Sequence, residues 1–224
     1  MLFQRAISDR LLRGMLATVL LAGLSLLSVS ESVAQTSHGS INIVSIEEDW
    51  ELVIATPDTN SNSPQIRCVM SPGADIEGAH AAFTINHRTR PSYDPGGMQL
   101  QAWYGEEVQG SQSHPSSERL SHEGETIRWT QKMSLSEGTL TFEILKGTST
   151  TWGAFGGQGY LKLSLGTDRT DLNSYLPRVS KDNSEVGFAA NRVQGLVLRK
   201  IRAYTTEGLY AQSDDGETIT IVEH

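Results

Sequence analysis

Apolar and polar residues alternate in short segments from residue 49 onward, and clusters of Gly, Pro, Asn, Asp and Ser separate these segments. A period of two places successive side chains on opposite faces of a β-strand. No segment after the first 34 residues repeats its apolar positions at the 3.6-residue period of a helix. The pattern predicts ten strands, enough for two packed sheets: Asp49–Thr56, Gln65–Ser71, Ala81–His87, Met98–Tyr104, Thr126–Leu135, Thr139–Lys146, Tyr160–Gly166, Ser184–Ala189, Gly195–Thr205 and Thr218–Glu223.

The clearest alternation lies between Thr126 and Lys146. Glu137-Gly138 supplies a short turn in the middle of this stretch, as a β-hairpin requires. The two halves place one apolar row each on a common face: Ile127, Trp129, Met133 and Leu135, then Leu140, Phe142 and Ile144. We therefore expect one hairpin here, with Trp129 in the core, and we assign Trp50 to the core by the same alternation.

The N-terminus has the pattern of a secretory signal peptide. Three arginines precede an apolar run of roughly thirteen residues, Met15 to Leu27, and small residues at Ser32-Val33-Ala34 offer a cleavage site. The run is too short to span a bilayer comfortably, although an uncleaved anchor stays an alternative. We expect a signal peptide over residues 1–34, an N-terminal segment over 35–48 and a single β-sandwich domain over 49–224. The mature protein would then be secreted, periplasmic or attached to the cell surface, without a stable membrane span.

Composition narrows the range of partners. The chain has 18 basic and 26 acidic residues, a net charge of −8, and its basic residues form no extended cluster, so nucleic acid is not an expected partner. Cys68 is the only cysteine, so no intramolecular disulfide can form. It lies in an alternating run with Ile66 and Met70, where a small buried hydrophobic side chain is the simplest interpretation.

The C-terminal third carries a family resemblance. Tyr160 to Gly166, the triplet Val186-Gly187-Phe188 and the run from Leu196 to Tyr204 resemble the closing strands of concanavalin A-like jelly rolls of the laminin G and lectin types. The resemblance implies an all-β, two-sheet antiparallel, jelly-roll-like sandwich. Members of that superfamily bind carbohydrates, bind proteins or cleave polysaccharides, so a fold of this kind does not fix the function.

The enzymes of that superfamily carry motifs that can be compared with this chain. Family-16-like glycoside hydrolases have a Glu-x-Asp-x-x-Glu strand; the nearest acidic group here, Glu47-Glu48-Asp49, is consecutive, and we expect its side chains to divide between the two faces. Alginate-lyase-like members have Gln-Ile/Val-His and Tyr-x-Lys-x-Gly segments, whereas this chain has Gln65-Ile66-Arg67 and Tyr160-Leu161-Lys162-Leu163-Ser164. Binding is therefore favoured over catalysis, with no catalytic residue assigned.

Three groups of residues are candidates for ligand contacts. Asp168, Asp171 and Asn173 bring oxygen ligands close enough in sequence to hold Ca²⁺, although such residues also populate ordinary turns. Arg199-Lys200-Ile201-Arg202 is a basic group that could meet acidic glycans or simply form a solvated strand face. The third group is aromatic and would stack on a sugar ring, unless its members pack inward: Trp152, Phe155, Trp103 and Tyr160.

These observations predict a secreted binding or interaction module whose partner is a carbohydrate or a protein at the cell surface, with carbohydrate as the leading ligand class. Two alternatives from other classes stay open. One is a polysaccharide-cleaving hydrolase or lyase with an unfamiliar site. The other is a structural surface protein that assembles through its edge strands.

Overall fold

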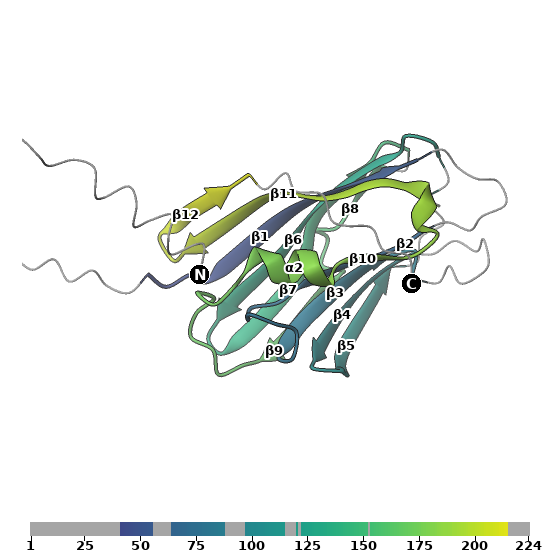
Figure 1. Cartoon of the computed structure of the whole chain (residues 1–224). Coiled ribbons are helices and arrows are strands. Elements are labelled where there is room, and N and C mark those ends of the chain that lie inside the picture. The colour runs from purple at the N-terminus through teal and green to yellow at the C-terminus, as the bar shows by residue number, and fades with distance from the viewer. Residues whose placement is uncertain are drawn as a thin grey trace, which may run out of the picture. The chain divides into compact units, whose positions relative to one another are not determined.

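The computed structural model describes residues 41–55, 64–87, 97–114, 120, 122–151 and 153–214 (Figure 1). Its strands form two antiparallel sheets. Sheet A has the order β12 (Gly208–Ser213), β11 (Val193–Thr205), β1 (Ser45–Ile54), β6 (Thr126–Ser136), β7 (Thr139–Ser149), β8 (Gly153–Phe155), and β9 (Lys162–Gly166) also pairs with β7. Sheet B has the order β10 (Glu185–Phe188), β2 (Gln65–Met70), β3 (Ala79–Ile85), β4 (Met98–Tyr104), β5 (Glu107–His114). Along the chain, a short helix, α2 (Pro177–Asn183), connects β9 to β10. A 3₁₀ turn, η1 (Ala190–Arg192), connects β10 to β11.

The predicted fold class, an all-β two-sheet antiparallel sandwich, is confirmed. The expected hairpin is the pair β6 and β7, in which Leu135 faces Leu140 next to the turn. Glu137 and Gly138 both adopt positive φ in that turn, where glycine is at no steric disadvantage. β1 begins at Ser45, earlier than the expected Asp49.

Four elements differ from the predicted set. The segment from 107 to 114 belongs to none of the predicted strands but forms β5, an edge strand without an apolar row. β12 is a second such edge strand, and β8 has only 3 residues. Helix α2 has 7 residues, which is too short to display a helical period, and a proline occupies its first turn as helix starts favour. The expected strand Thr218–Glu223 and the residues of the predicted signal peptide lie outside the described residues.

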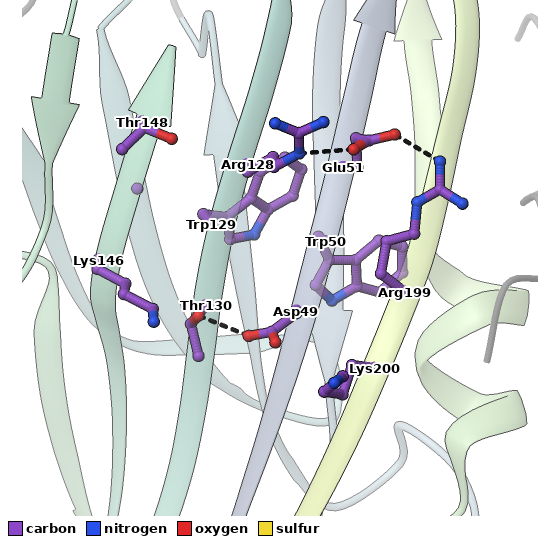
Figure 2. A pocket seen from close by; sticks show the side chains of 11 residues that line it. Asp49, Trp50, Glu51, Arg128, Trp129, Thr130, Lys146, Thr148, Arg199 and Lys200 are labelled. Atoms are coloured by element: carbon purple, nitrogen blue, oxygen red, sulfur yellow. Dashed lines mark hydrogen bonds and ion pairs between the residues drawn. The ribbon is translucent and has the colours of Figure 1, made fainter. Parts of the chain in front are cut away.

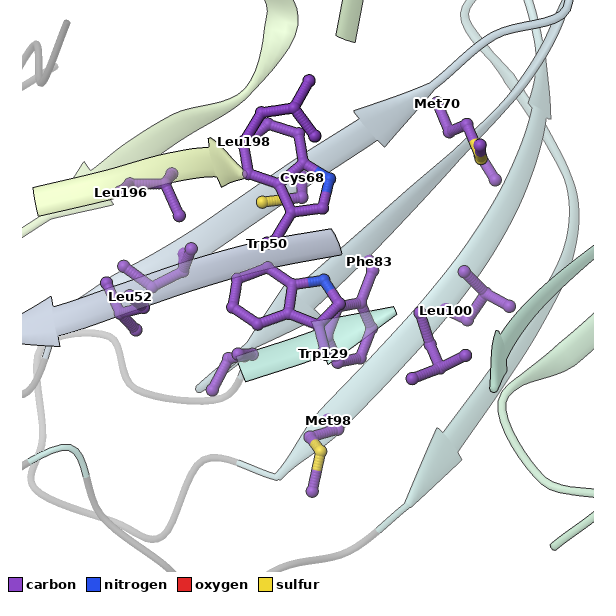
Figure 3. Packing of buried hydrophobic residues seen from close by; sticks show 14 of the residues in the cluster. Trp50, Leu52, Cys68, Met70, Phe83, Met98, Leu100, Trp129, Leu196 and Leu198 are labelled. Carbon is purple, nitrogen blue, oxygen red and sulfur yellow. The ribbon is translucent and has the colours of Figure 1, made fainter. Parts of the chain in front are cut away.

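Side chains that point between the sheets form one core (Figure 3). Trp50 of β1 stacks on Trp129 of β6 with ring centroids 6.2 Å apart, and Phe83 of sheet B meets the edge of Trp129 at 5.9 Å. Both tryptophans are buried, as expected. Cys68 is buried in the same core, and burial raises the pKa of its thiol, so the interpretation as a small hydrophobic side chain holds.

One carboxylate lies within this apolar surrounding. Glu48 is fully buried and accepts four hydrogen bonds, two at each oxygen. Trp50 Nε1 and Gln131 Nε2 donate to Oε2 at 2.9 and 2.6 Å, while the hydroxyls of Tyr175 and Ser180 donate to Oε1. Because Ser180 belongs to α2 and Gln131 to β6, the carboxylate ties the helix to the centre of sheet A.

Among the described helices, none has the length and apolar character to cross a membrane.

Adding a methyl group at Gly147 is expected to destabilise the fold. A Cβ built there would overlap the ring of Phe155, whereas one at Gly166 meets open space. Gly147→Ala should lower the free energy of unfolding by about 1–3 kcal/mol, because the core must shift to accept the extra atom. Gly166→Ala, the matched control, should change it by less than about 0.5 kcal/mol. Urea unfolding of both variants measures the difference, and equal effects would contradict the packing described here.

The buried Glu48 is expected to make stability depend on pH. Burial raises the pKa of Glu48 above its ordinary value of 4.5, although its four hydrogen bonds act in the opposite direction. The folded protein therefore holds this proton more tightly than the unfolded chain, so the stability that it contributes is complete below pH 4.5 and is lost as pH rises through the folded pKa. The excess stability of the wild type over Glu48→Gln should therefore fall as pH rises above 4.5.

Urea unfolding at several pH values tests this expectation. Glu107→Gln removes an exposed carboxylate of β5 and serves as the control for the loss of one negative charge. A wild-type excess over Glu48→Gln that rises with pH would show that the hydrogen bonds outweigh burial.

Candidate functional site

The outer face of sheet A, turned away from the core, contains an open hollow with a volume of about 450 Å³ (Figure 2). Four adjacent strands, β11, β1, β6 and β7, supply its walls. Its lining combines six charged side chains with apolar surface that includes the two core tryptophans: Asp49, Trp50, Glu51, Arg128, Trp129, Thr130, Lys146, Gly147, Thr148, Arg199 and Lys200.

A row of acids runs along β1 on this face. Ile46, Glu48 and Trp50 point inward, so the alternation of the strand turns Glu47, Asp49 and Glu51 outward. The expected division of consecutive acids between two faces is correct for Glu48. Glu51 extends the outward acids beyond the three consecutive residues considered in the sequence, so that Glu47, Asp49 and Glu51 form a row of alternate acids. Its spacing, Glu-x-Asp-x-Glu, is one residue shorter than the Glu-x-Asp-x-x-Glu strand.

Arginines on both neighbouring strands neutralise this row. Arg128 Nε of β6 lies 2.6 Å from Glu51 Oε2, and Arg199 Nη2 of β11 lies 2.5 Å from Glu51 Oε1. Figure 2 shows the two guanidinium groups on either side of the Glu51 carboxylate. Farther along β1, Arg202 contacts Asp49 at 2.6 Å and Glu47 at 3.0 Å. Opposite charges on facing strand positions stabilise sheet pairing, so part of this arrangement supports the fold.

The arginines hold the carboxyl groups in their ionised form. For Glu51, the hydrogen bond from Arg199 is the largest cause of a lowered pKa, and Arg128 adds to it. For Asp49, partial burial acts to raise the pKa, but hydrogen bonds from Arg202 and Thr130 and the nearby charge of Lys146 together lower it. Neither acid of the hollow therefore retains a proton near neutral pH.

Two register shifts place the basic side chains of the hollow. In β7, Thr130 faces Lys146 while Gln131 faces Ile144, which leaves Leu145 as an extra residue. In β11, Asp49 faces Lys200 while Trp50 faces Leu198, which leaves Arg199 as an extra residue. Bulges redirect the side chains around them. Both shifts border the hollow, so they present Lys146, Arg199 and Lys200 to the same space.

The predicted aromatic residues do not form one surface. Phe155 is buried and stacks on Phe83 with centroids 6.3 Å apart, which matches the alternative of inward packing. Tyr160 packs against His114, and its hydroxyl accepts a hydrogen bond from Gly156 N at 2.8 Å. Trp103 stacks on His80 in sheet B. Trp152 lies outside the described residues.

Two of the three predicted calcium ligands, Asp171 and Asn173, form hydrogen bonds with the backbone. The Asn173 side chain accepts a hydrogen bond from Ile43 N and donates one to the Ile41 carbonyl, which fixes the segment before β1. Asp171 accepts a hydrogen bond from Asn173 N within its own turn. In the described part of the chain, no group of three or more His, Cys, Asp or Glu is placed to hold a metal ion. Calcium binding by Asp168, Asp171 and Asn173 stays a prediction.

Sequence reasoning identified one part of the hollow. The basic group from Arg199 to Arg202 was singled out as a candidate for ligand contacts, whereas Arg128 was not. A period-of-two count of the acids from Glu47 to Glu51 would have revealed the acidic row. Nothing in the sequence indicates the two register shifts.

Comparisons with known proteins add little to this description. No protein-family model matches the chain, and no curated protein matches its sequence. Among solved structures, the chain is similar to the CBM40 of the Ruminococcus gnavus IT-sialidase bound to alpha2,6 sialyllactose. The identity is 14%, the TM-score is 0.26, and the match covers 80% of this chain and 74% of that one. The fold assignment rests on this chain's own sheets, and the likeness says nothing of what the chain binds.

Proposed function

We propose that the protein is a binding module that holds a carbohydrate in the hollow on the outer face of sheet A. The observation that carries the proposal is the lining itself, in which hydrogen-bonding side chains from four adjacent strands converge on one space. Sites built on strands hold their side chains more rigidly than sites built on loops. Sugars offer many hydroxyl groups, which both donate and accept, and the lining supplies donors such as Arg128 and acceptors such as Asp49 for them.

The size of the hollow supports a small ligand or a short stretch of a polymer. Its volume of about 450 Å³ lies within the usual range of small-molecule sites, which is about 300–1,000 Å³. The hollow is open, so a chain of sugars can continue beyond it. The exposed hydroxyl of Thr148 and the ammonium group of Lys146 stand at its β7 wall.

The charge states of the acids favour binding over catalysis. Glycoside hydrolysis by two carboxyl groups requires one of them to stay protonated so that it can protonate the leaving oxygen. The pKa values of Asp49 and Glu51 are both lowered, so neither suits that role. Their contacts with Arg202, Arg128 and Arg199 instead hold the side chains of the site in place.

Filling the hollow is expected to abolish glycan binding. Thr148→Tyr would place a ring in the space that the ligand occupies, while Thr139→Tyr adds the same ring to the same face of β7 outside the lining. On a broad glycan array, the wild type and Thr139→Tyr should bind the same glycans, and Thr148→Tyr should lose at least about tenfold in affinity, equivalent to about 1.4 kcal/mol.

Two outcomes would contradict the proposal. Silence of the wild-type protein across the whole array would remove carbohydrate as the ligand class. Equal binding by Thr148→Tyr and Thr139→Tyr would place the carbohydrate elsewhere on the molecule. Thermal unfolding of both variants confirms that each tyrosine leaves the fold intact.

A further inference from the structure

The hollow has the opposite charge to the molecule that carries it. Its lining contains four basic side chains, Arg128, Lys146, Arg199 and Lys200, against the two acids Asp49 and Glu51. The whole chain has a net charge of −8. A local excess of positive charge on an acidic protein attracts an anion to the hollow. The rest of the surface, which is acidic, does not bind polyanions non-specifically.

The two arginines have hydrogen-bond donors to spare. Each guanidinium carries five N–H groups. Among the described residues, Arg128 donates to Glu51 through Nε and Arg199 through Nη2. Their side chains are 66% and 51% exposed, so a ligand in solvent can approach both guanidinium groups. A planar carboxylate can accept two parallel hydrogen bonds from one such group.

Glu51 acts as a positioning residue for this pair. Its side chain is only 10% exposed, and each of its oxygens receives one guanidinium. Holding both arginines on one fixed carboxylate removes part of the entropy that they would otherwise lose when a ligand binds. It also leaves the trio Arg128, Glu51 and Arg199 with a net charge of +1, which matches one carboxylate group.

Lys146 supplies a further cation. In the part of the chain that the structure describes, it forms no ion pair within 4.0 Å, and its charge acts on Asp49 from a distance. Lys200, in contrast, is paired with Asp214 at 3.1 Å. The extra residue in β7 next to Lys146 directs this lysine toward the hollow.

We infer that the carbohydrate is an acidic polysaccharide whose carboxylate groups bind between Arg128 and Arg199, with Lys146 as a third contact. This inference rests on the proposed function and adds the chemical class of the ligand. Planar guanidinium donors match the planar carboxylate, whereas the oxygens of a sulfate ester are arranged tetrahedrally around sulfur. The sugar hydroxyl groups would meet Thr148.

Binding of the full chain to three carboxylated polysaccharides, polygalacturonate, alginate and hyaluronan, tests the inference. Each polymer is compared with its carboxyl-reduced form, in which the acid is an alcohol and the sugar backbone is kept. Affinity electrophoresis in about 0.1 M salt screens long-range attraction beyond about 10 Å. We expect at least one acid form to bind about tenfold or more tightly than its reduced form.

Variants that remove one positive charge each test whether the acid form of the polysaccharide binds in the hollow. Arg128→Gln and Lys146→Gln should each weaken binding of the acid form about tenfold, as expected for a lost charged hydrogen bond. Lys146→Gln breaks no ion pair, so a loss of affinity in that variant does not reflect loss of the fold. Arg178→Gln removes the same charge from an exposed position on α2, outside the lining, and should leave affinity unchanged.

Several results would overturn the inference. Equal binding of the acid and reduced forms, abolished by Thr148→Tyr, would leave the proposed function standing and remove the acidic ligand. The same conclusion follows if the array shows neutral glycans bound while all three acidic polymers fail. If Arg178→Gln and Arg128→Gln weakened binding equally, the polymers would be held by the overall charge of the protein and not by the hollow. Tighter binding of dextran sulfate than of the carboxylated polymers would lead to the same conclusion. Failure of every glycan would remove the proposed function as well.

Discussion

The alternation of side chains along β1 is the constraint on which the rest of the structure depends. The strand lies between β11 and β6, so it has no free edge, and one of its faces is buried in the core. A slip by one residue would expose Trp50 and bring Asp49 and Glu51 into the core, at a cost far above that of a lost contact. The register that buries Trp50 on Trp129 therefore also sets the acidic row of the outer face. Core and candidate site are two sides of one strand.

Glu48 is the exception within this alternation, because a carboxylate occupies an inward position. Its four hydrogen bonds compensate for much of the loss of water, yet burial still raises its pKa. Two of the donors, Tyr175 and Ser180, come from the segment that contains α2. A leucine at position 48 would pack well but would leave those hydroxyl groups without this acceptor. The carboxylate thus fixes the position of α2 through hydrogen bonds. A helix of seven residues is only marginally stable by itself and depends on such tertiary contacts.

Sequence reasoning succeeded where one face of a strand is apolar and failed where it is not. The hairpin of β6 and β7 was predictable because Ile127 to Leu135 and Leu140 to Ile144 each bury a row. β5 and β12 are edge strands whose residues are mostly polar or exposed, so their sequences show no burial period. The hollow was harder still. Arg128 and Arg199 are far apart in sequence and meet only at Glu51, and the extra residues Leu145 and Arg199 leave no local signal.

The arginines beside the acidic row of β1 decide whether its acids can act in catalysis or only in binding. Outward acids on alternate positions of a central strand can act in catalysis only if one of them is held in the protonated state. Here each outward acid of β1 contacts an arginine, and the pKa values of Asp49 and Glu51 fall. The same contacts that remove general-acid chemistry fix the guanidinium groups with donors directed at solvent. A site of fixed donors and ionised acceptors is suited to holding a polar ligand, and its two arginines on one carboxylate favour a ligand that is itself anionic.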